Sequence, residues 1–223
     1  MSKMRKAIII SLIIIATQFV AAFILYPTMP DRIAVHWNIN GEANGYGSRF
    51  IGLYLLPTIQ LLILPLFMIL PKIDPKHGID KFRQVYDWFI VGFIGFMAYI
   101  NSLSIAWNLG YRFDFNQMIT PLLGVAFYGI GMLLSKAKMN WFVGIRTPWT
   151  LSSEEVWNST HRLGGKLFKI CGVVSLLGLL LSGWYTFALA MGSVLVSTVY
   201  LVVYSYVEYE KLEKKADEKN NHN

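Results

Sequence analysis

Six apolar segments of membrane-spanning length constrain this chain more than any other feature of its sequence. The first, residues 7–26, is an uncharged run of 20 residues, and as a helix such a run spans about 30 Å, the thickness of a bilayer's hydrocarbon core. Five more follow at about residues 51–70, 88–109, 118–135, 167–183 and 186–207, with a turn expected at Ser182 and Gly183. Because backbone polar groups in lipid must pair internally, the sequence predicts an all-α integral membrane protein with six transmembrane helices.

The composition agrees with this class and excludes others. Hydrophobic residues make up 55% of the 223 residues and charged residues 15%, which is more apolar than a soluble domain of this size. The net charge of +7 does not indicate nucleic-acid binding, because the basic residues flank apolar segments as membrane anchors do. The single cysteine, Cys171, lies inside an apolar segment and is interpreted as a small core residue.

The distribution of basic residues predicts the orientation of the chain. With the amino terminus inside, 17 of the 20 Lys and Arg residues lie in the cytoplasm and Arg32, Arg49 and Arg112 lie outside. This asymmetry predicts that both termini are cytoplasmic. We therefore divide the chain into residues 1–70 (two spans and an external loop), 71–135 (spans three and four), 136–166 (a cytoplasmic loop), 167–207 (spans five and six) and 208–223 (a cytoplasmic tail).

The first external loop, residues 27–50, is predicted to be ordered. Pro27 and Pro30 end the first span, residues 33–37 favour a short extended segment, and the glycines accept positive φ. The pattern of prolines, glycines and aromatic residues resembles the DUF1648 domain. The residues assigned to a ligand-facing surface in this loop are His36, Trp37, Asn38, Gly41, Glu42 and Tyr46.

A metal site in this loop is the alternative interpretation of His36 and Glu42, because both residue types bind metals. The segment lacks the second histidine at i+4 that a helical zinc motif requires. We therefore expect no metal and no cofactor, and interpret His36 as a hydrogen-bonded residue that holds the loop together. Within the third span, the polar residues are expected to join helices and not to bind substrate; they are Asn101, Ser102, Ser104 and Asn108.

The cytoplasmic segment of residues 140–162, NWFVGIRTPWTLSSEEVWNSTHR, is the most informative part of the chain. Pro148 disfavours a helical conformation of the residue before it, so an extended or turn element is predicted at Arg146 to Thr150. Ser152 is predicted to cap a short amphipathic helix over residues 153–163 that lies in the membrane interface and ends at Gly164 and Gly165.

Two interpretations account for this segment. Its tryptophans fit an aromatic belt at the depth of the lipid headgroups, yet a generic anchor needs no arginine within a turn. The segment also resembles the SdpI family signature, Asn-x-x-x-Gly-Ile-Arg-Thr-Pro-Trp-Thr-Leu-Ser-x-Glu-x-Val-Trp-x-x-Thr-His-Arg. We name residues 136–166 the signature loop. Its candidate site residues are Asn140, Gly144, Arg146, Thr147, Pro148, Trp149, Glu155, Trp157, His161 and Arg162.

The resemblance implies a multi-pass protein of the bacterial cell membrane without enzyme activity. The founding member of the family confers immunity against a secreted peptide toxin and draws a winged-helix autorepressor to the membrane. The partners implied are therefore the lipid bilayer, a secreted peptide toxin outside and a winged-helix autorepressor inside, with no direct contact to nucleic acid. The inner surface for the repressor is assigned to Arg146, Trp149, Glu154, Glu155, His161 and Arg162.

Two other classes of function remain open from the sequence. A membrane-embedded enzyme or small transporter would use Glu154, Glu155, His161 and Arg162 at the headgroup region. An envelope-stress protein without a dedicated toxin would share every feature described above. The ionisable side chains other than Tyr and Cys lie at or near the ends of the spans, which argues against a proton or ion relay through the bundle.

Overall fold

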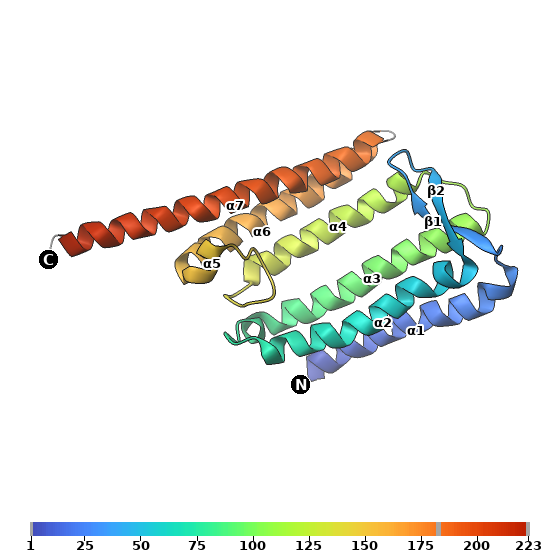
Figure 1. Cartoon of the computed structure of the whole chain (residues 1–223), viewed down its shortest axis with the longest axis horizontal. Coiled ribbons are helices and arrows are strands. Elements are labelled where there is room, and N and C mark those ends of the chain that lie inside the picture. The colour runs from blue at the N-terminus through green and yellow to red at the C-terminus, as the bar shows by residue number, and fades with distance from the viewer. Residues whose placement is uncertain (1, 182–183, 222–223) are drawn as a thin grey trace.

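The computed structural model describes residues 2–181 and 184–221, and this part of the chain contains six helices long and apolar enough to cross a membrane (Figure 1). They are α1 (Ser2–Leu25), α2 (Arg49–Ile73), α3 (Arg83–Asn108), α4 (Phe115–Lys136), α6 (Glu154–Leu177) and α7 (Trp184–Asn221). The prediction of an all-α, multi-pass membrane protein is confirmed. The expected turn at Ser182 and Gly183 lies outside the described residues.

The shorter elements connect these helices. They are η1 (Tyr26–Thr28), β1 (Arg32–Trp37), β2 (Ala43–Ser48), η2 (Ile79–Phe82), α5 (Pro148–Ser152) and η3 (Gly178–Leu180). Strands β1 and β2 form an antiparallel hairpin in the first external loop, which confirms the predicted extended segment.

The helices form two groups joined by α4. Helices α1, α2 and α3 pack together, and α4 packs on α3 on one side and on α6 and α7 on the other (Figure 1). The amino terminus, the α2–α3 connection, the signature loop and the carboxyl terminus lie at one end, which we name the inner end. The β1–β2 hairpin lies at the opposite, outer end. The basic segments assigned to the cytoplasm thus share one end of the molecule.

A seam of glycines holds α4 against the antiparallel α6. A Cβ atom at Gly124 would lie 2.9 Å from the carbonyl oxygen of Gly172, and one at Gly131 would lie 2.8 Å from that of Gly165. The two backbones are therefore in direct contact. Helices in lipid associate through van der Waals packing of this kind, because lipid removes the hydrophobic driving force between them.

The seam explains why the predicted helix end at Gly164 and Gly165 is wrong. Helix α6 runs without interruption to Leu177, because these glycines permit close packing and do not form a helix C-cap. A Cβ atom at Gly164 would lie 2.6 Å from the Ile145 side chain. The predicted separate interfacial helix is thus the first part of the fifth membrane helix.

Two local predictions at the start of that helix also need correction. Its N-cap is Ser153, one residue later than predicted, and the Ser153 side chain accepts a hydrogen bond from the backbone N–H of Val156. Thr147 is extended, as predicted, but the five-residue helix α5 begins directly after it. Pro148 takes the first helical position, where its missing N–H costs nothing.

Three buried amide side chains join α1, α2 and α3 within the membrane. Gln18 and Gln60 exchange hydrogen bonds of 2.9 and 3.0 Å, and Asn101 donates to the Gln18 side-chain oxygen at 3.2 Å. Amide groups in hydrocarbon require partners, so this cluster sets the rotation of three helices relative to one another. The expectation that polar residues of the third span join helices is confirmed for Asn101. Ser102 instead bonds within α3, and Ser104 and Asn108 bond to Ala34 of β1.

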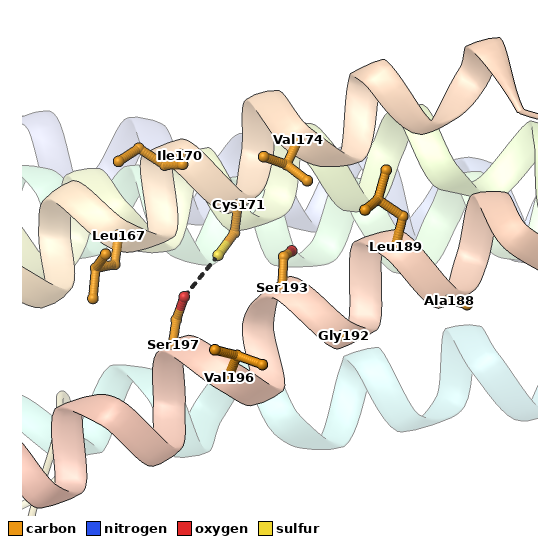
Figure 2. Close-up of a pocket in the computed structure, with 10 residues that line it drawn as sticks. All are labelled: Leu167, Ile170, Cys171, Val174, Ala188, Leu189, Gly192, Ser193, Val196 and Ser197. Carbon is orange, nitrogen blue, oxygen red and sulfur yellow. Dashed lines mark hydrogen bonds between the residues drawn. The ribbon is translucent and has the colours of Figure 1, made fainter.

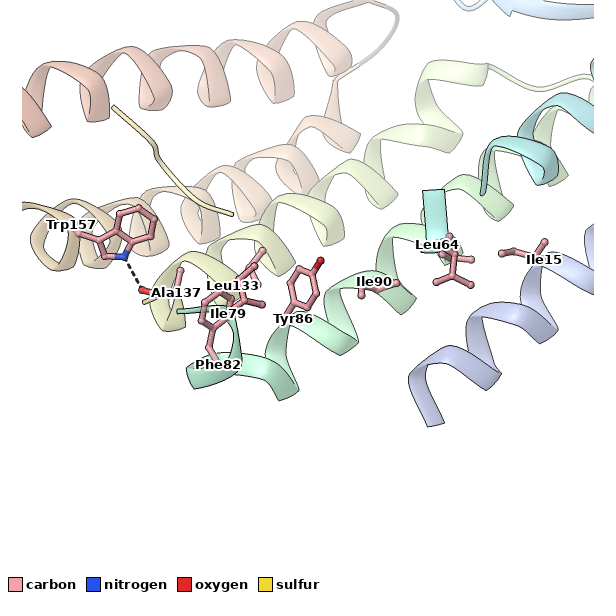
Figure 3. Packing of buried hydrophobic residues seen from close by; sticks show 10 residues of the cluster. Ile15, Leu64, Ile79, Phe82, Tyr86, Ile90, Leu133, Ala137 and Trp157 are labelled. Carbon is pink, nitrogen blue, oxygen red and sulfur yellow. Dashed lines mark hydrogen bonds between the residues drawn. The ribbon is translucent and has the colours of Figure 1, made fainter. Parts of the chain in front are cut away.

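The largest hydrophobic cluster reaches from mid-membrane into the inner loops (Figure 3). Tyr86 of α3 donates a hydrogen bond of 2.9 Å to the carbonyl oxygen of Phe67. Trp157 is fully buried and its indole N–H donates to the carbonyl oxygen of Ala137 at 3.1 Å. The inner loops are thus packed into the bundle as part of its core.

A cavity of about 380 Å³ lies between α6 and α7, beside Cys171 (Figure 2). The Cys171 sulfur lies 3.2 Å from the Ser197 hydroxyl oxygen, and the side chain is buried. Cys171 is therefore a small core residue, as predicted, at a position where space remains on one side.

Replacing Gly131 by alanine should destabilise the fold, because its Cβ atom would lie 2.7 Å from the backbone nitrogen of Lys169. We expect a loss of about 1–3 kcal/mol in the free energy of unfolding, measured by denaturation in detergent. A Cβ atom at Gly129 on the same helix would have no neighbour within 4 Å, so Gly129→Ala should be neutral or stabilising by up to about 1 kcal/mol. Equal changes in the free energy of unfolding for the two variants would contradict close packing of α4 against α6 at Gly131.

The orientation predicts which sites a membrane-impermeant maleimide reaches. In a Cys171→Ala background, Glu42→Cys in the hairpin should be labelled in intact cells. Glu154→Cys, at the inner end, should be labelled only after lysis. Labelling of Glu154→Cys in intact cells would reverse the assigned topology.

Candidate functional site

The outer hairpin owes its shape to one asparagine and one glycine. The Asn38 side-chain oxygen accepts hydrogen bonds from the backbone N–H groups of Asn40 and Glu42, at 2.9 and 3.0 Å. Gly41 has a φ of 77°, which other residues rarely adopt. A Cβ atom there would also lie 2.8 Å from the Asp114 carboxylate. Asn38 and Gly41 therefore shape the turn between the strands and its contact with the next external loop.

Helices α3 and α4 hold this hairpin in place. The Asn108 side chain of α3 accepts from the Ala34 backbone N–H at 2.8 Å and donates to the Ala34 carbonyl oxygen at 2.9 Å. Trp37 stacks on Phe115 of α4 with ring centroids 4.1 Å apart. Trp37 was assigned to the ligand-facing surface, but the structure places its ring against the helices. The hairpin is therefore a braced cap on the outer end.

Three of the assigned outer residues remain exposed on the hairpin, namely His36, Glu42 and Tyr46. The side chain of His36 is hydrogen bonded to Asn44, with 2.6 Å between Nδ1 and Oδ1, as the interpretation of His36 as a loop-stabilising residue predicts. In the described part of the chain, no group of three or more His, Cys, Asp or Glu residues could hold a metal ion. These exposed side chains can make polar and aromatic contacts to a ligand.

At the inner end, Asp74 joins the α2–α3 connection to the signature loop. Its buried carboxylate accepts from the backbone N–H groups of Gly78 and Ile79 at 2.7 and 3.3 Å. It also accepts from the N–H groups of Lys76 and Trp141, at 3.3 and 3.2 Å. Charge-assisted bonds to four N–H groups fix both loops. The sequence-based prediction missed Asp74, because its turn pattern indicates the local bonds but not the partner at Trp141.

Asn140 shapes the start of the loop. Its side-chain oxygen accepts from the N–H groups of Phe142 and Val143 at 2.8 and 2.6 Å. Its amide nitrogen donates to the carbonyl oxygens of Lys138 and Val143, both at 2.8 Å. Asn140 is fully buried and all of these bonds are internal, so its role is to form this turn.

His161 holds the next turn from α6. Its Nε2 accepts from the Ile145 N–H at 3.0 Å, and its Nδ1 lies 2.8 Å from the Trp157 carbonyl oxygen, so Nδ1 carries the proton. Trp157 stacks on the imidazole at 3.9 Å between ring centroids, which confirms that the two residues share a helical face. Gly144 has a φ of 125° and leaves no room for a Cβ atom beside Nε2. Both ring nitrogens of this buried histidine are therefore engaged.

The final part of the loop is attached to α7. Thr147 and Thr150 form a reciprocal capping box that begins α5. The Thr147 hydroxyl oxygen lies 3.0 Å from that of Ser205, and Trp149 packs on Tyr206 with ring centroids 5.1 Å apart. The loop thus links α7 to the rest of the inner end.

The residues assigned to the signature loop therefore fall into two sets. The first set builds the loop through internal contacts and consists of Asn140, Gly144, Thr147, Trp149, Trp157 and His161. The set with exposed side chains consists of Arg146, Pro148, Glu154, Glu155 and Arg162. Of the assigned inner surface, His161 is buried and the four charged residues are accessible, so a partner at this face would meet mainly charged side chains.

Two segments of the chain match known families, and nearly the whole chain matches one curated protein. Residues 136–205 match the SdpI/YfhL protein family, and residues 13–61 match the Domain of unknown function DUF1648. The chain is 29% identical over 209 residues to the Immunity protein SdpI of Bacillus subtilis (strain 168), covering 93% of this chain and 98% of that protein. No solved structure matches the chain. The chain is therefore a multi-pass bacterial membrane protein that is similar to the SdpI/YfhL family over residues 136–205, and its outer hairpin lies in the segment that matches DUF1648.

Proposed function

We propose that this protein is an immunity protein that protects the cell against a secreted antimicrobial peptide toxin. The observation that carries the proposal is the similarity to the Immunity protein SdpI, which extends over 93% of the chain and includes both faces. A similarity confined to one loop would not support a role in immunity to a toxin.

The toxin is proposed to contact the outer hairpin through His36, Glu42 and Tyr46. These side chains are exposed, and Tyr46 exposes 51% of its surface. Trp37, Asn38 and Gly41 act indirectly, because they brace or shape the hairpin. A rigid surface with an exposed tyrosine is a favourable binding site, since tyrosines often contribute strongly to binding and little ordering is required.

The winged-helix autorepressor is proposed to bind the inner end at Arg146, Glu154, Glu155 and Arg162. These residues are exposed and carry both signs of charge. Such surfaces confer orientation and specificity on a partner more than raw affinity. The buried residues of the signature loop hold them in place.

The two faces are joined by continuous helices. Helix α4 begins at Phe115, which stacks on Trp37, and ends beside Ala137, whose carbonyl oxygen accepts the bond from Trp157. Its 22 residues span about 33 Å. Toxin binding would signal to the inside if it favoured a state in which the inner surface binds the repressor more tightly.

Binding is favoured over catalysis for the signature loop. Acid–base catalysis by His161 would require an accessible ring nitrogen, but His161 is buried and both nitrogens are engaged by backbone groups. The accessible side chains among the assigned residues are arginines, glutamates and a proline, which suits partner recognition.

Expression of the chain in a toxin-sensitive bacterium should increase survival in the presence of a secreted peptide toxin of the type that SdpI-family proteins resist. Tyr46→Ala should weaken toxin binding by about 1–2 kcal/mol and reduce protection. Tyr111→Ala is the matched control, because Tyr111 is 68% exposed and lies in the second external loop, outside the assigned ligand-facing surface. Unchanged killing despite membrane insertion of the wild type would overturn the proposed function.

The inner surface should affect signalling without affecting protection. The double variant Glu155→Ala, Arg162→Ala should lose toxin-dependent activation of a repressor-controlled reporter and retain resistance to killing. Lys211→Ala in the tail, also an exposed charge, is the control and should behave like the wild type. Full induction by the double variant would exclude these residues as the repressor site.

A further inference from the structure

A cavity of about 550 Å³ lies beneath the signature loop. Five helices line it, with Leu70 of α2, Tyr86 of α3, Leu134 of α4, Phe168 of α6 and Val202 of α7 on its walls, and residues 142–147 cover its inner end. The first three of these residues lie near the inner ends of their helices. The cavity therefore lies at the depth where the cytoplasmic leaflet meets its headgroups.

One charged residue, Arg146, borders this mainly apolar cavity. Its guanidinium donates to the Trp141 carbonyl oxygen at 2.6 Å from Nη1, and within the described residues it forms no ion pair. That bond leaves most of the guanidinium donors available for an anion. The neighbouring Trp141 N–H is bonded to Asp74, so the same tryptophan anchors both the loop and the arginine.

The local charge favours an anionic ligand at this rim. The sequence contains no Asp or Glu between Asp114 and Glu154, whereas Lys136, Lys138 and Arg146 lie in that interval. The nearby Asp74 carboxylate is already satisfied by four backbone N–H groups. A guanidinium at headgroup depth is suited to a phosphate oxygen.

We propose that the cavity binds one anionic phospholipid from the cytoplasmic leaflet, with an acyl chain against the apolar walls and its phosphate on Arg146. Lipid is the apolar molecule that surrounds this part of the protein, and basic pockets between membrane helices on the cytoplasmic side are sites for anionic headgroups. The bound lipid would fill the space between the α1–α2–α3 group and the α4–α6–α7 group. This site shares Arg146 with the inner surface proposed for the repressor, but lipid binding can be measured without the toxin or the repressor.

The test uses the purified full-length protein in detergent and native mass spectrometry with two lipids of identical acyl chains. Phosphatidylglycerol should bind about 5- to 10-fold more tightly than phosphatidylethanolamine. Arg146→Gln should abolish this preference. Arg112→Gln, which removes an arginine at the outer end, should retain it. Equal affinities of the wild type for the two lipids, or a preference that survives Arg146→Gln, would overturn the proposal.

A second variant tests the acyl-chain part separately. Thr198→Phe adds an aromatic ring at an exposed, cavity-lining position of α7 and should weaken the binding of both lipids. Soluble glycerol phosphate at the same concentration should not displace bound phosphatidylglycerol. Displacement by glycerol phosphate, or unchanged lipid binding by a folded Thr198→Phe variant, would show that the cavity does not hold the acyl chain.

Discussion

The direct backbone contact between α4 and α6 is the interaction on which the rest of the structure depends. Glycines spaced seven residues apart on each helix meet in antiparallel register, Gly124 with Gly172 and Gly131 with Gly165. In lipid, two smooth apolar helices gain little by associating, so close approach along a seam of small residues supplies the packing energy. This contact places the start of α6 beside the end of α4, which is where the signature loop must fold.

Around this seam, a few polar side chains determine how the remaining parts are arranged. The amide cluster of Gln18, Gln60 and Asn101 sets the first three helices, and Asp74 ties their inner connection to Trp141 of the signature loop. Each of these polar groups is buried, so leaving it without a partner would be costly. Polar bonds thus specify the arrangement of an otherwise apolar bundle.

At both ends of the molecule, one group of residues holds a loop in place and another group is exposed on it. Outside, Asn108, Trp37 and Gly41 hold the hairpin so that His36, Glu42 and Tyr46 are displayed. Inside, Asn140, Thr147 and His161 hold the signature loop so that its charged residues are displayed. Helix α4 braces both surfaces, through the stack of Phe115 on Trp37 outside and the hydrogen bond from Trp157 to Ala137 inside. The proposed binding of one partner on each side of the membrane would use two such preorganised surfaces.

Much of this protein was determined by its sequence alone. Uncharged runs such as residues 7–26 dictate membrane helices because lipid cannot satisfy exposed backbone groups, and Asn38 and Gly41 dictate a turn through local bonds. Only the tertiary structure decided those features that depend on residues far away in the sequence. The sequence around Gly164 and Gly165 indicates a helix end, yet contact with α4 makes these glycines packing positions inside a continuous helix. The sequence predicts that Trp157 and His161 lie in the membrane interface, yet packing between α4, α6 and the signature loop buries both side chains. Asp74 shows the same limit, because a turn pattern cannot reveal a hydrogen bond to a residue in another loop, and only the folded bundle brings the two together.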